Sequence, residues 1–142
     1  MDYDKKMEKI IKTNEKYLDE FEKWLENKKL NPKTINRHVS NAYLYINDYL
    51  NYYEFCKMED GCRCIDGFLG DWFVRKCLWS TASSVKSTAA SIKKFYQCMN
   101  ELGYVDKSDY SMLCDEIKDS MEFWIENVEE YNSGDFDYYG IF

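Results

Sequence analysis

The chain has 142 residues, 45% of them apolar and 18% aromatic, with one proline, six glycines and a formal net charge of −7. This composition indicates one compact folded domain and argues against a β-sandwich or barrel, which needs many turns. No apolar run approaches the length of about 18 residues that a membrane span needs. The first twenty residues are charged throughout and lack an apolar stretch of signal-peptide type, so we expect a cytoplasmic protein.

The first two predicted elements are helices joined by a short turn. Apolar side chains at helical spacing predict an amphipathic helix over about residues 2–28. Asn31 and Pro32 predict the start of a second helix, since Asn caps helix N-termini and Pro suits the first helical position. The apolar face of this second helix is expected to run from Ile35 to Leu50.

The second half of the predicted bundle repeats this order of short helix, turn and longer helix. A loop is predicted over Lys57–Cys64, and a short helix over Asp66–Lys76 follows it. Ser80 or Thr81 is expected to cap the fourth helix, and Gly103 is a natural helix stop. Its expected inner face comprises Val85, Ala89, Ile92, Phe95, Tyr96, Met99 and Leu102.

A fifth helix is predicted after a cap at Ser108 or Asp109. Its apolar side comprises Tyr110, Leu113, Ile117, Met121, Trp124 and Val128. Its other side is acidic and comprises Asp115, Glu116, Asp119, Glu122, Glu126 and Glu129. Residues 131–142 show no helical period and are expected to form an ordered arm or a loose tail. No strand pattern is found, so the predicted fold is all-α.

The same apolar pattern occurs twice, 48 residues apart. The first copy consists of Phe21, Trp24, Leu25 and Leu30, and the second of Leu69, Trp72, Phe73 and Leu78. Each copy precedes a helix start signal and a long amphipathic helix. The repeat therefore predicts two helical hairpins within residues 1–107, with residues 108–142 appended as an acidic amphipathic helix and an aromatic tail that pack on the same domain.

The charge is distributed unevenly along the chain. Residues 1–107 hold 18 of the 19 Lys and Arg and 16 of the 26 Asp and Glu, whereas residues 108–142 hold Lys118 alone against ten acids. Such asymmetry indicates a basic part with an acidic segment attached. The acidic face of the fifth helix is most simply a solvated surface. Alternatively, it repels or mimics DNA, folds over the basic part, or presents negative charge to a DNA-binding partner.

No cofactor, metal or enzyme signature emerges from the six cysteines, the one histidine or the glycines. Cys56, Cys62 and Cys64 cluster around the predicted loop, but one C-x-C lacks the paired spacing of structural zinc sites, so we interpret them as thiols near a surface loop. His38 is expected on the surface or half-buried, without a Cys or carboxylate partner. Phosphate-binding loops and hydrolase motifs are absent from the sequence, so we expect no catalysis.

The order F-x-x-W-L-x₄-L-N-P-K-T-I-x₃-V, then F-L-x₂-W-F, then S-T-A-S-S-V-K-S-T-A-A-S-I-K-K-F-Y-x₃-N-E-L-G resembles the N-terminal core-binding domain of tyrosine recombinases, the phage integrases. The resemblance covers about residues 17–105. It implies a SAM-like bundle of four helices in which a Ser/Thr-rich turn opens each of the two long helices. The family carries its chemistry in a separate domain with two Arg, a His-containing motif and a nucleophilic Tyr. This sequence has no residues to fill such a site, so the resemblance implies a non-catalytic domain.

The resemblance also implies a DNA-binding surface, because these domains clamp duplex DNA with their two long helices. The positions that correspond are Lys33, Thr34, Arg37, Ser84, Lys86, Ser87, Lys93 and Lys94. Helix N-termini and short hydroxyls suit phosphate contacts, which supports this interpretation. The implied role is that of a mobile-element accessory factor or the remnant of a recombinase gene in DNA recombination.

The alternative function is protein–protein interaction without DNA binding, through the acidic helix and the aromatic tail. Tyr52, Tyr53, Tyr138 and Tyr139 are the candidate partner-binding residues, because paired aromatics outside a helical stripe suit an interface. The partner would be another protein or a second copy of this chain. No membrane or small-molecule partner is expected.

Overall fold

The computed structural model describes residues 2–133, and these residues fold into helices without a β-strand among them. The α-helices are α1 (Asp2–Asn27), α2 (Pro32–Tyr43), α3 (Ile65–Gly67), α4 (Phe73–Lys76), α5 (Ala82–Glu101) and α6 (Lys107–Asn132). Two π-helical segments, η1 (Leu44–Tyr49) and η3 (Phe68–Trp72), and one 3₁₀ segment, η2 (Met58–Arg63), complete them. The all-α prediction is confirmed.

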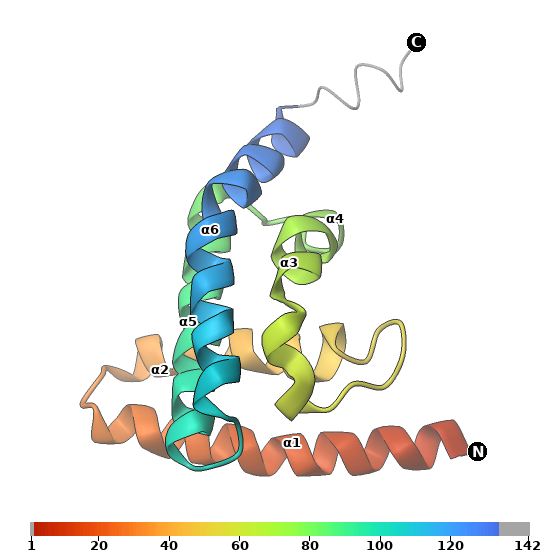
Figure 1. The fold of residues 1–142 in the computed structure, drawn as a ribbon, viewed down its shortest axis with the longest axis vertical. Coiled ribbons are helices and arrows are strands. Elements are labelled where there is room, and N and C mark those ends of the chain that lie inside the picture. The colour runs from red at the N-terminus through yellow and green to blue at the C-terminus, as the bar shows by residue number, and fades with distance from the viewer. Residues whose placement is uncertain (1, 134–142) are drawn as a thin grey trace.

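The arrangement centres on α5. Helices α5 and α6 run side by side, and α1 crosses one end of the pair (Figure 1). Helix α2 packs on α5 and continues into η1, while α3, η3 and α4 follow one another without a break. This run of α3, η3 and α4, which corresponds to the predicted short helix over residues 66–76, packs mainly against α6 and η1. Helices α2 and α5, the second and fourth helices of the predicted bundle, therefore lie directly against each other; α1 and α6, with 26 residues each, are the longest helices among the described residues.

The core is rich in aromatic side chains contributed by every major helix. Its largest fully buried members include Phe21, Leu25, Tyr45, Ile46, Phe68, Leu69, Phe73, Phe95, Tyr96 and Trp124. Both copies of the apolar repeat contribute to this core. The last residue of the second copy, Leu78, does not, because it lies in the turn after α4 and is 98% exposed.

Capping explains where the long helices begin. The side chain of Asn31 accepts the N–H of Thr34 at 2.8 Å with Pro32 at the first helical position, as predicted. Thr81 and Ser84 form a reciprocal capping box at the start of α5. Helix α6 begins earlier than predicted: Asp106 has the extended cap conformation and its carbonyl accepts the N–H of Tyr110 at 3.1 Å. The predicted cap at Ser108 or Asp109 is wrong.

Three further expectations are corrected. Residues 58–63 of the predicted loop form η2, because Met58 and Cys62 are buried and Gly61 packs beneath Tyr96. Leu102 is exposed, since α5 ends at Glu101. Helix α6 extends through Asn132, whose side chain donates to the carbonyl of Ser80 at 2.7 Å, into the stretch predicted to lack helix.

Helix α6 is an integral part of the bundle. Trp124 is buried and donates to Asp66 Oδ1 at 2.7 Å, and Asn127 donates to the carbonyl of Gly70 at 2.8 Å. Leu113 and Val128 are fully buried on the same side of the helix. Removal of α6 would expose this apolar surface, so the basic part of the chain is not a separable unit.

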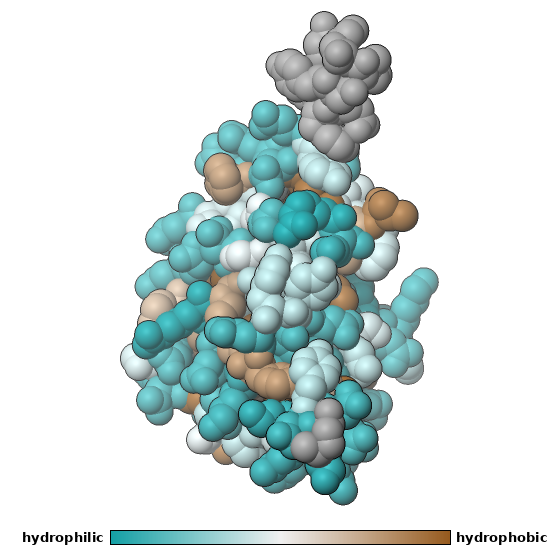
Figure 2. Space-filling model, turned by 90° about the vertical axis from the view of Figure 1, so that its right-hand side faces the viewer, coloured by the Kyte–Doolittle hydropathy of each residue, from teal (hydrophilic) through white to brown (hydrophobic). Residues whose placement is uncertain are grey.

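No helix among residues 2–133 combines the length and the apolar character that crossing a membrane requires. On the face seen in Figure 2, hydrophilic side chains dominate and hydrophobic atoms form small separate groups.

Candidate nucleic-acid interface

The contact between α2 and α5 is built around one hydroxyl group, that of Ser91. Ser91 Oγ donates to the carbonyl of Ser87 at 3.1 Å and accepts from Asn41 Nδ2 at 3.0 Å. Nδ1 of His38 lies 2.7 Å from the same oxygen. With the hydroxyl proton directed to the Ser87 carbonyl, the tautomer that completes the set of hydrogen bonds carries its proton on Nδ1 of His38 and donates it to Ser91. The hydroxyl is then fully satisfied.

His38 is buried, with 4% of its surface exposed, which corrects the expectation of a surface or half-buried residue. Arg37 faces solvent, and the next position on α2 turns toward α5, where Ser91 accepts its hydrogen bond. Burial lowers the pKa of His38 below its ordinary 6.5, and the nearby charges of Arg37 and Lys94 lower that pKa further. The imidazole is therefore neutral at pH 7.

The basic side chains of the two long helices meet at this contact. On α2, Lys33 and Arg37 are exposed one helical turn apart. On α5, Lys93 is exposed and Lys94 half-buried, and Lys94 acts on the same imidazole as Arg37. Arg37 of α2 and Lys94 of α5 therefore lie near one another, on either side of the helix contact, and the role of the basic set in DNA binding stays a prediction.

Acidic residues are nearly absent from the two helices that carry these cations. Helices α2 and α5 contain five Lys and Arg in total but one carboxylate, Glu101, at the end of α5. That carboxylate accepts from Trp24 Nε1 at 2.9 Å and from Gln97 at 3.3 Å. Within residues 2–133, the two ion pairs, Arg63–Asp109 and Arg75–Asp71, involve neither helix. The Lys and Arg side chains of α2 and α5 therefore form no ion pair among the described residues.

The hydroxyl residues predicted at this face have divided roles. Ser84 accepts the N–H of Thr81 at 2.7 Å and donates to its carbonyl at 3.1 Å, so it holds the start of α5. Thr34 uses its N–H on the Asn31 cap. Ser87 is half-buried on the side of α5 that carries Ser91. At the start of α5, the first two amide groups have no acceptor among the described residues, and such groups suit a phosphate oxygen.

Lys86 completes the predicted basic set. It is exposed on α5 two turns before Lys93, with the exposed Ala90 between them. A small residue at this place allows close approach of the helix to a groove wall, which is consistent with the predicted stripe.

The acidic side of α6 faces solvent. Asp115, Asp119, Glu122, Glu126 and Glu129 are exposed, whereas Glu116 is half-buried and accepts from Ser120 Oγ. Helix α6 lies along α5 and against η2, α3 and η3. In the part of the chain that the structure describes, no ion pair joins α6 to α2 or α5. The acidic side chains therefore lie beside the basic face and are not paired with it.

The predicted partner-binding tyrosines form a separate group. Tyr52 and Tyr53 are exposed and pack edge to face, with ring centroids 4.9 Å apart. Lys76 Nζ lies 4.9 Å from the Tyr52 ring, and Arg75 donates to the Tyr53 hydroxyl at 3.2 Å. The lysine also lowers the pKa of Tyr52. Tyr138 and Tyr139 lie outside the described residues.

Sequence reasoning missed Ser91 and Asn41, the polar residues that join the two long helices. A signal was present, because Ser84, Ser87 and Ser91 follow one another at intervals of three and four residues. This spacing places small residues on one side of α5, where another helix can approach closely. No three His, Cys, Asp or Glu side chains within residues 2–133 are grouped to hold a metal ion.

Comparison with models of protein families, with curated proteins and with solved structures gave no significant match.

Proposed function

We propose that this chain binds duplex DNA through the α2–α5 face as a non-catalytic domain that resembles the core-binding domain of tyrosine recombinases. The observation that carries the proposal is the charge of these packed helices: five Lys and Arg side chains against a single carboxylate. Lysine and arginine contacts to phosphates supply most sequence-independent affinity for DNA.

The binding mode follows from the residue types on the face. Lys33, Arg37, Lys86, Lys93 and Lys94 would contact phosphates, together with the free amide groups at the start of α5. Arg37 carries the one guanidinium of this set, the group whose rigid planar fork is best suited to bidentate contacts, and the set contains no Asn or Gln for adenine. The proposal is therefore binding with little discrimination between sequences.

The test compares two double variants with equal change in charge. Arg37→Gln with Lys94→Gln alters the proposed face, whereas Lys5→Gln with Lys12→Gln alters exposed lysines of α1. Fluorescence anisotropy of a labelled duplex is measured over a salt series. We expect the first variant to weaken binding about tenfold at about 50 mM salt and to reduce the slope of log K against log salt by up to about two.

The α1 variant is expected to change affinity by less than the α2–α5 variant and to keep the slope of the unmodified chain. Absence of binding at about 50 mM salt, where phosphate contacts are strong, would falsify the proposal. Equal losses of DNA affinity in the two double variants would show that binding depends on net charge alone, and they would contradict the proposal that the α2–α5 face contacts DNA.

A second candidate function, protein–protein interaction, is favoured by one specific observation. In the turn after α4, the side chains of Leu78 and Trp79 are 98% and 64% exposed. This turn follows Lys76, the last residue of α4, whose ammonium group lies over the Tyr52 ring. Exposed large apolar side chains grouped with aromatics are typical of partner surfaces. If self-association is the function, Trp79→Ser reduces the dimer fraction in sedimentation equilibrium and leaves DNA affinity unchanged.

A further inference from the structure

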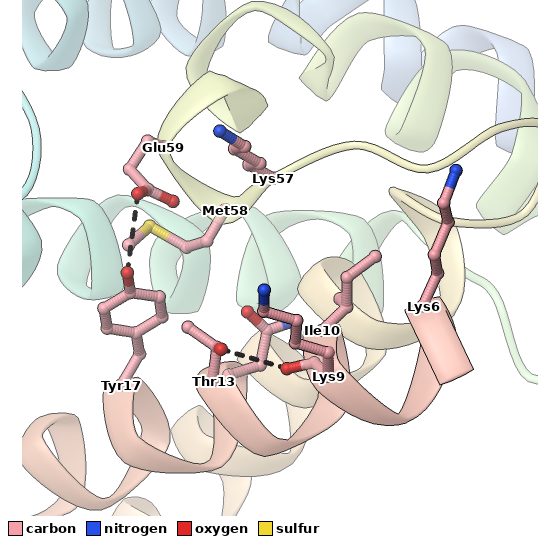
Figure 3. A pocket seen from close by; sticks show the side chains of 9 residues that line it. Lys6, Lys9, Ile10, Thr13, Tyr17, Lys57, Met58 and Glu59 are labelled. Carbon is pink, nitrogen blue, oxygen red and sulfur yellow. Dashed lines mark hydrogen bonds between the residues drawn. The ribbon is translucent and has the colours of Figure 1, made fainter. Parts of the chain in front are cut away.

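A cavity of about 330 Å³ lies between the first half of α1 and the segment that leads into η2. Figure 3 shows Ile10 and Tyr17 on α1 facing Met58 and Glu59 across it. Ile10 and Met58 contribute apolar surface, and the cavity lies at the small end of the range typical of ligand sites. It lies apart from the α2–α5 face, since none of its lining residues belongs to those helices.

Three lysines line the cavity, and they come from two different elements. Lys6 and Lys9 belong to α1, and Lys57 immediately precedes η2 (Figure 3). Within residues 2–133 none of the three forms an ion pair. Lysine side chains in the wall of a concave, partly apolar site make it electrostatically complementary to an anionic group.

The one carboxylate in the cavity wall, that of Glu59, is already engaged. Glu59 Oε2 accepts from the Tyr17 hydroxyl at 3.4 Å. Burial raises the pKa of Tyr17, and the neighbouring Glu59 charge raises it further, so the phenol stays a donor at neutral pH. The three lysines thus outnumber the acid that faces them.

A buried polar side chain completes the lining. Asn14 is 2% exposed, and its amide nitrogen donates to Asn47 Oδ1 at 2.8 Å and to the carbonyl of Ile46 at 3.2 Å. Its carbonyl oxygen has no donor among the described residues. An acceptor in this position favours a ligand that brings a hydrogen-bond donor.

We propose that this cavity binds a small apolar molecule that carries one anionic group and one hydrogen-bond donor. The anionic group would contact Lys9 and Lys57 at the rim, the apolar body would lie against Ile10 and Met58, and the donor would reach Asn14. The DNA-binding proposal is independent of this site.

Three probes separate these contributions. 4-Hydroxyphenylacetate has the carboxylate, the ring and the hydroxyl donor; phenylacetate lacks the donor; and 4-methylphenol lacks the carboxylate. Binding is followed by amide chemical shifts in ¹⁵N-labelled protein. We expect 4-hydroxyphenylacetate to shift the amides of Ile10, Thr13 and Asn14, and each of the other probes to bind at least about fivefold more weakly, as expected for loss of one polar contact.

Two variants of equal charge change test the lysines. Lys9→Gln with Lys57→Gln is expected to weaken 4-hydroxyphenylacetate binding about tenfold or more. Lys5→Gln with Lys12→Gln, at exposed positions outside the lining, is expected to leave it unchanged. The proposal is overturned if millimolar probe shifts no cavity amide, if the shifts gather at Leu78 and Trp79, or if both double variants lose affinity equally.

Discussion

Ser91 shows how one small polar residue can position two helices. Its hydroxyl makes three hydrogen bonds in a buried setting, to Ser87, Asn41 and His38. Without this contact His38, which is 4% exposed, would be a buried polar group without a partner, at a cost of about 1–3 kcal/mol. The same contact holds His38 near the charges of Arg37 and Lys94, so a structural hydrogen bond also joins the two helices of the proposed DNA-binding face.

The lowered pKa of His38 makes the free energy of unfolding depend on pH. In the unfolded chain the imidazole titrates near 6.5, but in the folded chain it titrates at lower pH. Below pH 6.5 the unfolded chain therefore holds more protons, and the free energy of unfolding decreases as the pH falls, until His38 is protonated in the folded state as well. The charged groups that act on the ring are Arg37 and Lys94.

We expect His38→Asn to remove this pH dependence, because the Asn amide can still donate to Ser91 and does not titrate. The measurement is urea unfolding at several pH values from about 7 to about 5, a range that includes the ordinary pKa of His. The difference in unfolding free energy between the two proteins should change with pH below 6.5 and be constant above it. A constant difference throughout would contradict the assignment.

At the scale of elements, the sequence was sufficient for the helix order and for two of the helix starts. Asn31, Pro32 and Thr81 signal their caps by local chemistry, which the fold leaves unchanged. The burial of His38 and the exposure of Leu78 depend on which helix packs opposite, information that periodicity does not contain. The basic set was proposed from family resemblance and stays a prediction, whereas the contact of His38 and Asn41 with Ser91 depends on the packing of α2 on α5.

The 3₁₀ segment η2 depends on a residue without a side chain. A Cβ at Gly61 would lie 2.1 Å from the Tyr96 hydroxyl oxygen and 2.9 Å from Leu50 Cδ1. Tyr96 cannot easily move, since it is fully buried and donates to the carbonyl of Met58 at 2.8 Å. Glycine thus allows η2 to approach α5 closely, which explains why a segment predicted as a loop is packed into the core.

We expect Gly61→Ala to lower the free energy of unfolding by about 1–3 kcal/mol, the typical cost of overpacking a core. Asp60→Ala, at the exposed neighbouring position of η2, is expected to change it by less than about 0.5 kcal/mol. Chemical unfolding followed by tryptophan fluorescence measures both. Equal effects of the two variants would show that η2 tolerates a Cβ at Gly61 and would contradict the close approach.

At the scale of the whole molecule, the opposite charges are sorted onto neighbouring helices. Helices α2 and α5 carry the proposed DNA-binding cations, and α6 presents a solvent-exposed acidic side while lying against α5. Since α6 buries Leu113, Trp124 and Val128, it cannot leave without disrupting the core. In the proposed DNA-binding mode, the acidic helix would repel DNA from a fixed position, by a long-range interaction that salt weakens.

Neutralising this helix is expected to strengthen DNA binding at low salt. The variant combines Asp119→Asn, Glu122→Gln and Glu126→Gln, all exposed on α6. We expect about two- to fivefold tighter binding in anisotropy titrations at about 50 mM salt and little change at about 300 mM, because screening shortens the reach of these charges.

The control variant combines Asp4→Asn, Glu8→Gln and Glu15→Gln, and it changes the net charge equally at exposed positions of α1. Helix α6 lies along α5 whereas the N-terminal end of α1 projects away from it (Figure 1), so the control should have the smaller effect. Equal gains in DNA affinity for the two variants would show that only the net charge matters. An unchanged affinity of the α6 variant would show that the acidic side of α6 does not affect DNA binding.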